Sequence, residues 1–242
     1  METSTQKLEQ LRKRIRDSRY MVVLTGAGIS AESGVPTFRG KNGLWKHYRV
    51  EELATPEAFA RNPQLVWEWY NWRRQLIASL SHNPAHSALV ELEKNSHHFT
   101  LITQNVDGLH HKAGSKNVLE IHGNIWKVRC TACNQVSENY EVPLKILPYC
   151  GICGGLLRPN VVWFGEPLPR DVLARADNVL SLCDLMMVIG TSGVVQPVAS
   201  FPYYARAKGA FVVEINLERT PISWVAHQTI LGKAGEILPL LL

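Results

Sequence analysis

Four short apolar runs recur along the chain, and segments with helical patterning separate them. The runs are residues 21–24, 98–102, 185–189 and 211–215. Short runs rich in Val, Ile, Leu and Met are typical of strands that are buried on both faces of a parallel sheet. Their alternation with helical patterns, such as those at 85–94 and 171–181, predicts an α/β fold with a Rossmann-like, doubly wound parallel sheet.

Polar or glycine residues follow each of these four runs. They are Thr25-Gly26, Thr103-Gln104-Asn105, Gly190-Thr191-Ser192 and Asn216-Leu217-Glu218. In open α/β sheets, ligands bind at the carboxyl ends of the strands. The sequence therefore predicts a ligand cleft along this edge of the sheet.

Two insertions interrupt the α/β pattern. Residues 41–81 read as helical and aromatic, and residues 124–161 carry cysteine pairs with no room for a helix of normal length between them. We expect these insertions to form a smaller domain, a zinc ribbon plus a helical part. The remaining ranges, 1–40, 82–123 and 162–242, form the larger Rossmann-like domain.

The spacing C-x2-C-x16-C-x2-C is a strong zinc-ribbon pattern. Its members are Cys130, Cys133, Cys150 and Cys153. Four thiolates complete a tetrahedron and leave no open position, so we expect one structural Zn²⁺. A pair of redox dithiols is the alternative. Cys183 lies in an apolar run and is expected to be a buried small hydrophobe.

Charge and hydropathy exclude several classes of protein. The chain has 242 residues with a net charge of +5, and it contains no apolar run long enough to cross a membrane. Residues 1–17 read as an amphipathic helix with no secretory signal. The basic residues of this region are better explained as a solvated helix face than as a nucleic-acid patch. We expect a cytoplasmic monomer with no membrane partner, since paired cysteines outside a disulfide framework indicate a reducing compartment.

A glycine-containing loop follows the first run. Residues 26–31, GAGISA, fit the G-x-G-x-x-A pattern in which glycines let the backbone approach a pyrophosphate. A plain tight turn is the alternative, and the acidic residue usual in dehydrogenases is not identifiable. The sequence after the loop, through residue 40, suggests an ordered but movable lid on which Arg39 is available to a phosphate.

His122 is the candidate general base. It lies between a strand-like piece at 118–121 and Gly123-Asn124, and a neutral imidazole suits that role near pH 7. A structural histidine is the alternative. His110 and His111 compete with it on sequence alone.

These motifs together resemble the sirtuin family of NAD-dependent protein deacylases. The resemblance rests on GAGIS at 26–30, PTFR at 36–39, QNVD at 104–107, HG at 122–123, the four cysteines, GTS at 190–192 and NLE at 216–218. It spans about residues 20–236 in the right order. The compact zinc module and short termini are similar to the bacterial members.

The resemblance implies that NAD is a consumed cosubstrate held by the larger domain. The residues implied for the pyrophosphate and the lid are Gly26, Ala27, Gly28, Ser30, Phe38, Arg39 and Trp45. Those implied for the nicotinamide and ribose are Gln104, Asn105, Val106 and Asp107. Those implied for the adenosine are Gly190, Thr191, Ser192, Asn216, Leu217, Glu218 and Ala234.

The implied chemistry begins with loss of nicotinamide and capture of the ribose by the acyl-lysine carbonyl oxygen. His122, with Asn105 as the second implied catalytic residue, then acts as base on a ribose hydroxyl. The products are free lysine, nicotinamide and O-acyl-ADP-ribose. The alternatives are an NAD-dependent mono-ADP-ribosyltransferase or NAD hydrolase, and a non-enzymatic zinc-ribbon binding module.

The partners implied are acyl-lysine proteins or peptides. The peptide-contacting residues expected are Val162, Trp163, Phe164, Gly165, Glu166, Val194 and Val195, since an extended substrate can add a strand between such edges. Tyr70 and Arg73 resemble the Tyr-x-x-Arg pair of sirtuins that act on succinyl- and malonyl-lysine. Ala54 resembles the small residue that leaves space for the longer acyl chain. A solvated Arg73 on an amphipathic helix is the alternative.

Overall fold

A six-stranded parallel sheet forms the centre of the molecule. The computed structural model describes residues 4–38, 44 and 49–242, and the sheet order is β3-β2-β1-β7-β8-β9. The strands are β1 (Tyr20–Thr25), β2 (His98–Thr103), β3 (Val118–Glu120), β7 (Leu185–Ile189), β8 (Phe211–Asn216) and β9 (Gln228–Leu231). The chain moves outward from β1 to β3, then restarts at β7 on the other side of β1. This reversal is the switch point at which doubly wound sheets bind ligands, and it confirms the predicted fold.

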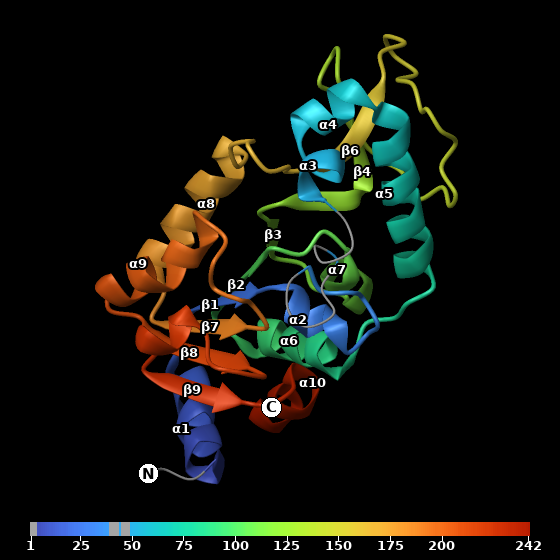
Figure 1. Ribbon diagram of the computed structural model, residues 1–242. Coiled ribbons are helices and arrows are strands. Elements are labelled where there is room, and N and C mark those ends of the chain that lie inside the picture. Colours follow the sequence, from blue (N-terminus) through green and yellow to red (C-terminus); the bar gives the residue numbers. More distant parts are fainter. Residues whose placement is uncertain (1–3, 39–43, 45–48) are drawn as a thin grey trace.

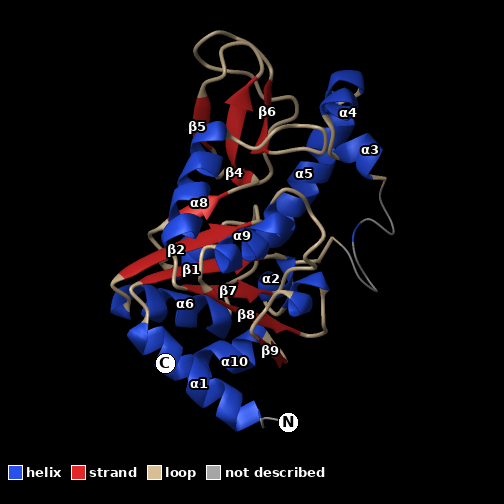
Figure 2. Ribbon diagram, turned by 90° about the vertical axis from the view of Figure 1, so that its left-hand side faces the viewer, coloured by secondary structure: helices blue, strands red, loops and turns tan. Residues whose placement is uncertain are grey.

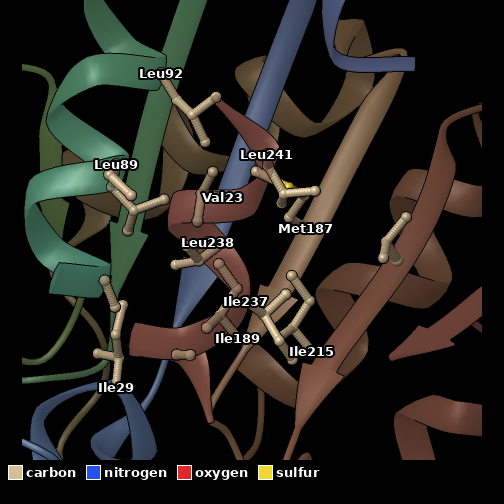
Figure 3. Close-up of a cluster of buried hydrophobic side chains, with 14 of the residues drawn as sticks. Val23, Ile29, Leu89, Leu92, Met187, Ile189, Ile215, Ile237, Leu238 and Leu241 are labelled. Atoms are coloured by element: carbon tan, nitrogen blue, oxygen red, sulfur yellow. The ribbon is translucent and has the colours of Figure 1, made fainter. Parts of the chain in front are cut away.

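Helices cover both faces of this sheet (Figure 2). One face carries α1 (Ser4–Asp17), α6 (Pro84–Asn95), α10 (Ala234–Ile237) and the short helix η4 (Leu238–Leu241). The other carries α8 (Arg170–Leu182) and α9 (Phe201–Ala207). Alternate side chains of one strand point to opposite faces, so Val23 joins the first core while Val22 and Leu24 join the second. Figure 3 shows Leu89 and Leu92 of α6 packed with Val23 and with side chains of η4.

A second, smaller body lies beyond the carboxyl edge of the sheet (Figure 1). Its antiparallel sheet has the order β5-β4-β6, with β4 (Gly123–Cys130), β5 (Val136–Glu138) and β6 (Leu157–Val161). Three helices pack with it, namely α3 (Val50–Leu53), α4 (Pro56–Arg61) and α5 (Pro63–Ala78). Trp67, Val128 and Trp163 belong to a common core there, so the two insertions do pack together. The domain boundaries stay a prediction.

Capping residues explain where the helices of this body begin. Thr55 accepts a hydrogen bond from the Ala58 amide at the start of α4, and Asn62 accepts one from the Leu65 amide at the start of α5. A proline follows each cap, where its fixed φ favours the first helical turn. Asn62 thus both ends α4 and begins α5, so the two helices follow each other with a single residue between them.

The remaining elements are short and lie at strand ends or loops. They are α2 (Ala27–Ala31), α7 (Leu109–Ala113), η2 (Val198–Ser200) and η3 (Pro221–Trp224). The segment 26–31, predicted as a glycine-containing loop, is largely helical, because α2 begins directly after Gly26. In the part of the chain that is described, no helix is long and apolar enough to span a bilayer.

Candidate active site

A cavity of about 850 Å³ opens at the carboxyl ends of β1 and β7, between the large sheet and the smaller body. The predicted residues on its wall are Gly26, Ala27, Gly28, Phe38, Ala54, Tyr70, Arg73, Gln104, Asn105, Val106, His122, Val162, Trp163, Phe164, Gly165, Glu166, Gly190, Thr191, Ser192, Val195, Asn216, Leu217 and Glu218. Ser30, Asp107, Val194 and Ala234 are not part of that wall. Arg39 and Trp45 lie outside the described residues.

The glycines of the first loop are required by a close approach of two strand ends. The Gly28 amide donates to the Gly190 carbonyl at 2.8 Å. A Cβ added to Gly26 or Gly28 would lie 2.8 Å from backbone atoms of Gly190, closer than real Cβ atoms come. Gly190 itself has a φ of +60°, which side-chain-bearing residues rarely adopt. The loop after β1 and the loop after β7 therefore form one continuous floor.

Hydrogen bonds join the polar strand ends across this floor. The Asn105 amide nitrogen donates to the Gly26 carbonyl at 3.1 Å and to Ser30 Oγ at 3.2 Å. Gln104 Nε2 donates to Thr191 Oγ1 at 2.9 Å, and Asn216 Nδ2 donates to the Thr191 carbonyl at 2.8 Å. Ser30 thus lies beneath the wall and supports Asn105.

His122 is the one of the three competing histidines that lines the cavity. Its Nδ1 lies 3.1 Å from the Gln104 carbonyl oxygen. A carbonyl only accepts, so Nδ1 carries the proton and the Nε2 lone pair is left available. Burial lowers the pKa of His122, although the Gln104 carbonyl opposes this. The imidazole is therefore neutral near pH 7 and suited to accept a proton.

The other two histidines have different surroundings. His110 is buried under the floor, with Nε2 3.0 Å from Thr25 Oγ1. His111 lies 3.3 Å from a Glu120 carboxylate oxygen, and this contact raises its pKa. Asp107 is also buried. Its carboxylate accepts from the Leu109 amide at 2.9 Å, and burial raises its pKa against the opposing effect of that bond.

No sequence pattern indicated His86, which packs against His110 with ring centroids 4.9 Å apart. Burial, and then the nearby His82, lower the pKa of His86 to about 4. A histidine in the unfolded chain has a pKa of about 6.5, so below that pH the unfolded chain binds a proton at His86 that the folded chain does not bind. The contribution of His86 to the free energy of unfolding is therefore fully present above pH 6.5 and is lost as the pH falls towards 4.

We expect His86→Gln to flatten the acid side of the stability profile. Urea unfolding between pH 7.5 and 4.5 should show the wild type losing about 1.4 kcal/mol more per pH unit below pH 6 than the variant. His97→Gln, at an exposed histidine, is the control and should follow the wild type. Parallel profiles for wild type and His86→Gln would contradict the buried, neutral state.

Tyr70 and Arg73 lie together on α5 and face the cavity. Arg73 is only 5% exposed, and its guanidinium carbon lies 4.8 Å from the centre of the Phe38 ring and 5.0 Å from that of Trp69. No carboxylate of the described residues lies within ion-pairing distance of Arg73. Arg73 is therefore a buried cation among aromatic rings, and the alternative of a solvated arginine is wrong.

The segment predicted to contact a peptide is held from two sides. The Phe164 amide donates to the Ala54 carbonyl at 3.0 Å, and the Val162 amide donates to the His122 carbonyl at 2.9 Å. Glu166 accepts from Arg158 at 2.6 and 2.8 Å. The Glu166 carboxylate is thus bound to this chain's own arginine, which sequence patterns did not indicate.

The four zinc-ribbon cysteines form one cluster in which all four Sγ atoms lie within 4.8 Å of one another. The close pairs cross between the two CxxC motifs, with Cys130 Sγ 3.4 Å from Cys153 Sγ and Cys133 Sγ 3.9 Å from Cys150 Sγ. A tetrahedron with Zn–S bonds of about 2.3 Å has S–S edges of about 3.8 Å. The residues fit one closed zinc site, as predicted, and Cys183 is not part of it.

Comparison with known proteins gives concordant matches. The Sir2 family model matches residues 26–197. An NAD-dependent protein deacylase of Aquifex aeolicus (strain VF5) is 58% identical over 216 residues, which cover 89% of this chain and 90% of that protein. A solved Sir2 homolog–NAD complex is 51% identical with a TM-score of 0.91, covering 96% of this chain and 92% of the other. A Sir2 structure with a deacetylated p53 peptide and 3′-O-acetyl ADP-ribose is 35% identical with a TM-score of 0.86, covering 97% of each chain.

Proposed function

This chain belongs to the Sir2 family and is an NAD-dependent protein deacylase, and we propose that it removes succinyl and malonyl groups, as well as acetyl, from lysine. The observation that carries the proposal is Arg73, a buried cation on the cavity wall that makes no ion pair with a carboxylate of the described residues and interacts with Asp107 only at longer range. A buried charge is costly unless it is paired, so a site of this kind favours a ligand that brings an anion. The family relatives are named as deacylases, and an ADP-ribosyltransferase is not favoured.

Tyr70 and Arg73 supply the chemistry that an acyl carboxylate requires. A guanidinium donates two parallel hydrogen bonds to a carboxylate, and a phenol can add a third. Ala54 lies on the same wall, and its methyl group leaves more space for a four-carbon acyl chain than a larger residue would. The acyl end of the substrate is thus proposed to lie among α5 side chains.

The reacting end is proposed to lie at His122. Nicotinamide leaves first, the acyl oxygen captures the ribose, and His122 Nε2 then takes the proton of a ribose hydroxyl. Asn105 is proposed to hold the ribose end of NAD from the floor of the cavity, where Ser30 fixes its amide group. The products are nicotinamide, free lysine and O-acyl-ADP-ribose.

The substrate backbone is proposed to lie between residues 161–166 and 193–195. Main-chain hydrogen bonds to such edges make little demand on peptide sequence. Zinc has no part in the reaction, because four thiolates leave it no open position. A thiolate site of this kind also favours a reducing compartment, and we propose the cytoplasm.

Arg73→Met tests the acyl class. With matched acetyl- and succinyl-peptides, we expect desuccinylation to lose about 10–150-fold in kcat/KM, the value of one hydrogen-bonded charged contact, while deacetylation changes little. Arg73→Lys keeps the positive charge but lacks the paired N–H donors of a guanidinium. Its kcat/KM for desuccinylation should therefore lie between those of the wild type and Arg73→Met. NAD-dependent nicotinamide release is the readout.

Arg61→Met is the matched control, since Arg61 is an exposed arginine of the same body. It should leave both activities as they are. An equal loss of desuccinylation and deacetylation in Arg73→Met would refute the proposed acyl class without touching the assignment to the family.

A further inference from the structure

Trp163 and Tyr70 meet at the wall of the cavity although they are far apart in the sequence. Trp163 Nε1 donates a hydrogen bond to the Tyr70 hydroxyl oxygen at 2.9 Å, and both side chains are buried. An indole N–H has no acceptor capacity. The Tyr70 oxygen must therefore accept from Trp163, and its own proton must point elsewhere.

Arg73, which has the largest electrostatic effect on Tyr70 of the charged groups around it, is also a donor. Arg73 lies with its guanidinium carbon 5.9 Å from the centre of the Tyr70 ring, and a guanidinium cannot accept. No side chain or carbonyl of the described residues accepts the Tyr70 proton. The Trp163 N–H is satisfied by Tyr70, so the Tyr70 hydroxyl and the Arg73 guanidinium are the two donors left on this part of the cavity wall, and the group that completes them is an acceptor such as a carboxylate.

Trp163 is held on its ring and on its backbone. The Arg158 guanidinium carbon lies 3.4 Å from the centre of the Trp163 ring, and the Phe59 ring lies 5.3 Å from it. The Trp163 amide donates to Glu166 Oε2 at 2.8 Å, and Arg158 binds the same carboxylate. The indole N–H is therefore aimed at Tyr70 by a rigid arrangement, and little entropy is lost when a ligand binds.

We propose that Trp163 is a positioning residue for acyl selectivity, whose indole N–H directs the Tyr70 hydroxyl proton to the carboxylate of a succinyl or malonyl group. This inference rests on the proposed function, because it assumes that Tyr70 contacts an acidic acyl chain. The competing explanation is that Trp163 is only an apolar surface for any acyl chain or for the peptide. That explanation predicts equal effects on acetyl- and succinyl-peptides.

A double-mutant cycle separates the two explanations. The variants are Trp163→Phe, Tyr70→Phe and the double variant, and the readout is the succinyl-to-acetyl ratio of kcat/KM with matched peptides. We expect Trp163→Phe to lower this ratio about 2- to 12-fold, the value of one net hydrogen bond. In the Tyr70→Phe background, the same change should have no further effect on the ratio, since no hydroxyl proton remains to be directed.

Trp67→Phe is the matched control. Trp67 is a fully buried tryptophan of the same core, and its Nε1 donates to the Leu157 carbonyl at 2.9 Å. It does not line the cavity. Its loss should lower stability and leave the ratio unchanged.

A second replacement keeps the test decisive if Trp163→Phe folds poorly. Site-specific 3-benzothienylalanine at position 163 retains the bicyclic ring and exchanges the N–H for sulfur, so it should lower the ratio as Trp163→Phe does. An unchanged ratio, or an equal drop in the Tyr70→Phe background, would overturn the role of Trp163. If Tyr70→Phe and Arg73→Met both left the ratio unchanged, the proposed acyl class itself would be wrong.

Discussion

Replacing His122 with alanine is expected to lower turnover by about 10²–10⁴-fold, the usual contribution of a general base. The imidazole lines the cavity, and the Gln104 carbonyl fixes the proton on Nδ1. The free Nε2 is then the only part of this side chain that can take a proton from a ribose hydroxyl. The fold should persist, because the side chain's hydrogen bond to Gln104 is a single contact at the cavity edge.

The pH dependence of deacylation is an independent test of His122 as the general base. Burial lowers the pKa of His122, so the base is already neutral at the ordinary histidine pKa of about 6.5. Deacylation by the wild type should therefore lose activity only below about pH 6.5, as His122 becomes protonated. In His122→Ala, the residual activity should lack this acid limb.

Two controls show whether the loss is specific. His111→Ala removes a neighbouring histidine that does not line the cavity, and it should remain active. Nicotinamide leaves before His122 acts in the proposed chemistry, so His122→Ala should still exchange labelled nicotinamide into NAD. Near-normal deacylation by His122→Ala would show that another group is the base.

The strands that could be predicted are those whose own residues form a characteristic local pattern. Residues 185–189 were predicted as a strand and form β7 with the same bounds, because a fully buried parallel strand is a continuous apolar run. The edge strand β9 (Gln228–Leu231) was not predicted. It begins with two polar residues and has only four, so its strand conformation depends on pairing with β8.

Two neighbouring arginines on α5 have different surroundings, and the sequence alone does not predict which of them faces the cavity. Arg74 donates to the Ile125 carbonyl at 2.7 Å and to the Asn139 carbonyl at 2.7 Å, and burial lowers its pKa to about 10. Arg73, one residue earlier, faces the cavity instead. A helix turns about 100° per residue, so adjacent positions point in different directions, and only the tertiary packing decides which one meets the ligand. The resemblance to a Tyr-x-x-Arg pair was the sole signal for Arg73.

Contacts of the loop after β6 were beyond local patterns for the same reason. The Trp163–Tyr70 hydrogen bond joins α5 to the loop after β6, and the Arg158–Glu166 pair fixes that loop. Neither has a characteristic spacing. The cysteines differ, because metal coordination imposes a spacing that can be read directly.

Removal of zinc is expected to unfold the metal-binding part of the smaller body and to abolish activity in proportion to the metal lost. Several apolar side chains of this segment are exposed, with Tyr149 at 62% and Ile152 at 76%. The segment between Cys130 and β6 contains only the short strand β5 (Val136–Glu138), so it has little core of its own. Structural zinc contributes about 10–16 kcal/mol in zinc-finger peptides at pH 7, far more than such a segment gains from burial.

Hydrogen exchange after treatment with a chelator measures this effect. Amide protection should be lost in β5 and in the ends of β4 and β6 near the cysteines, while β1 and β7 keep theirs. Cys150→Ser should give the same pattern without chelator. Cys183→Ser is the control, because Cys183 is a buried cysteine outside the cluster and its replacement should leave the zinc content unchanged.

Activity should follow the metal although zinc has no open position for substrate. β4 begins at Gly123, immediately after His122, and β6 ends at Val161, immediately before the cavity residue Val162. The strands that the cysteines join thus lead directly into the proposed base and the proposed peptide edge. Full deacylation by metal-free protein, or undiminished protection of β5 after chelation, would show that packing against α5 holds these strands without the metal.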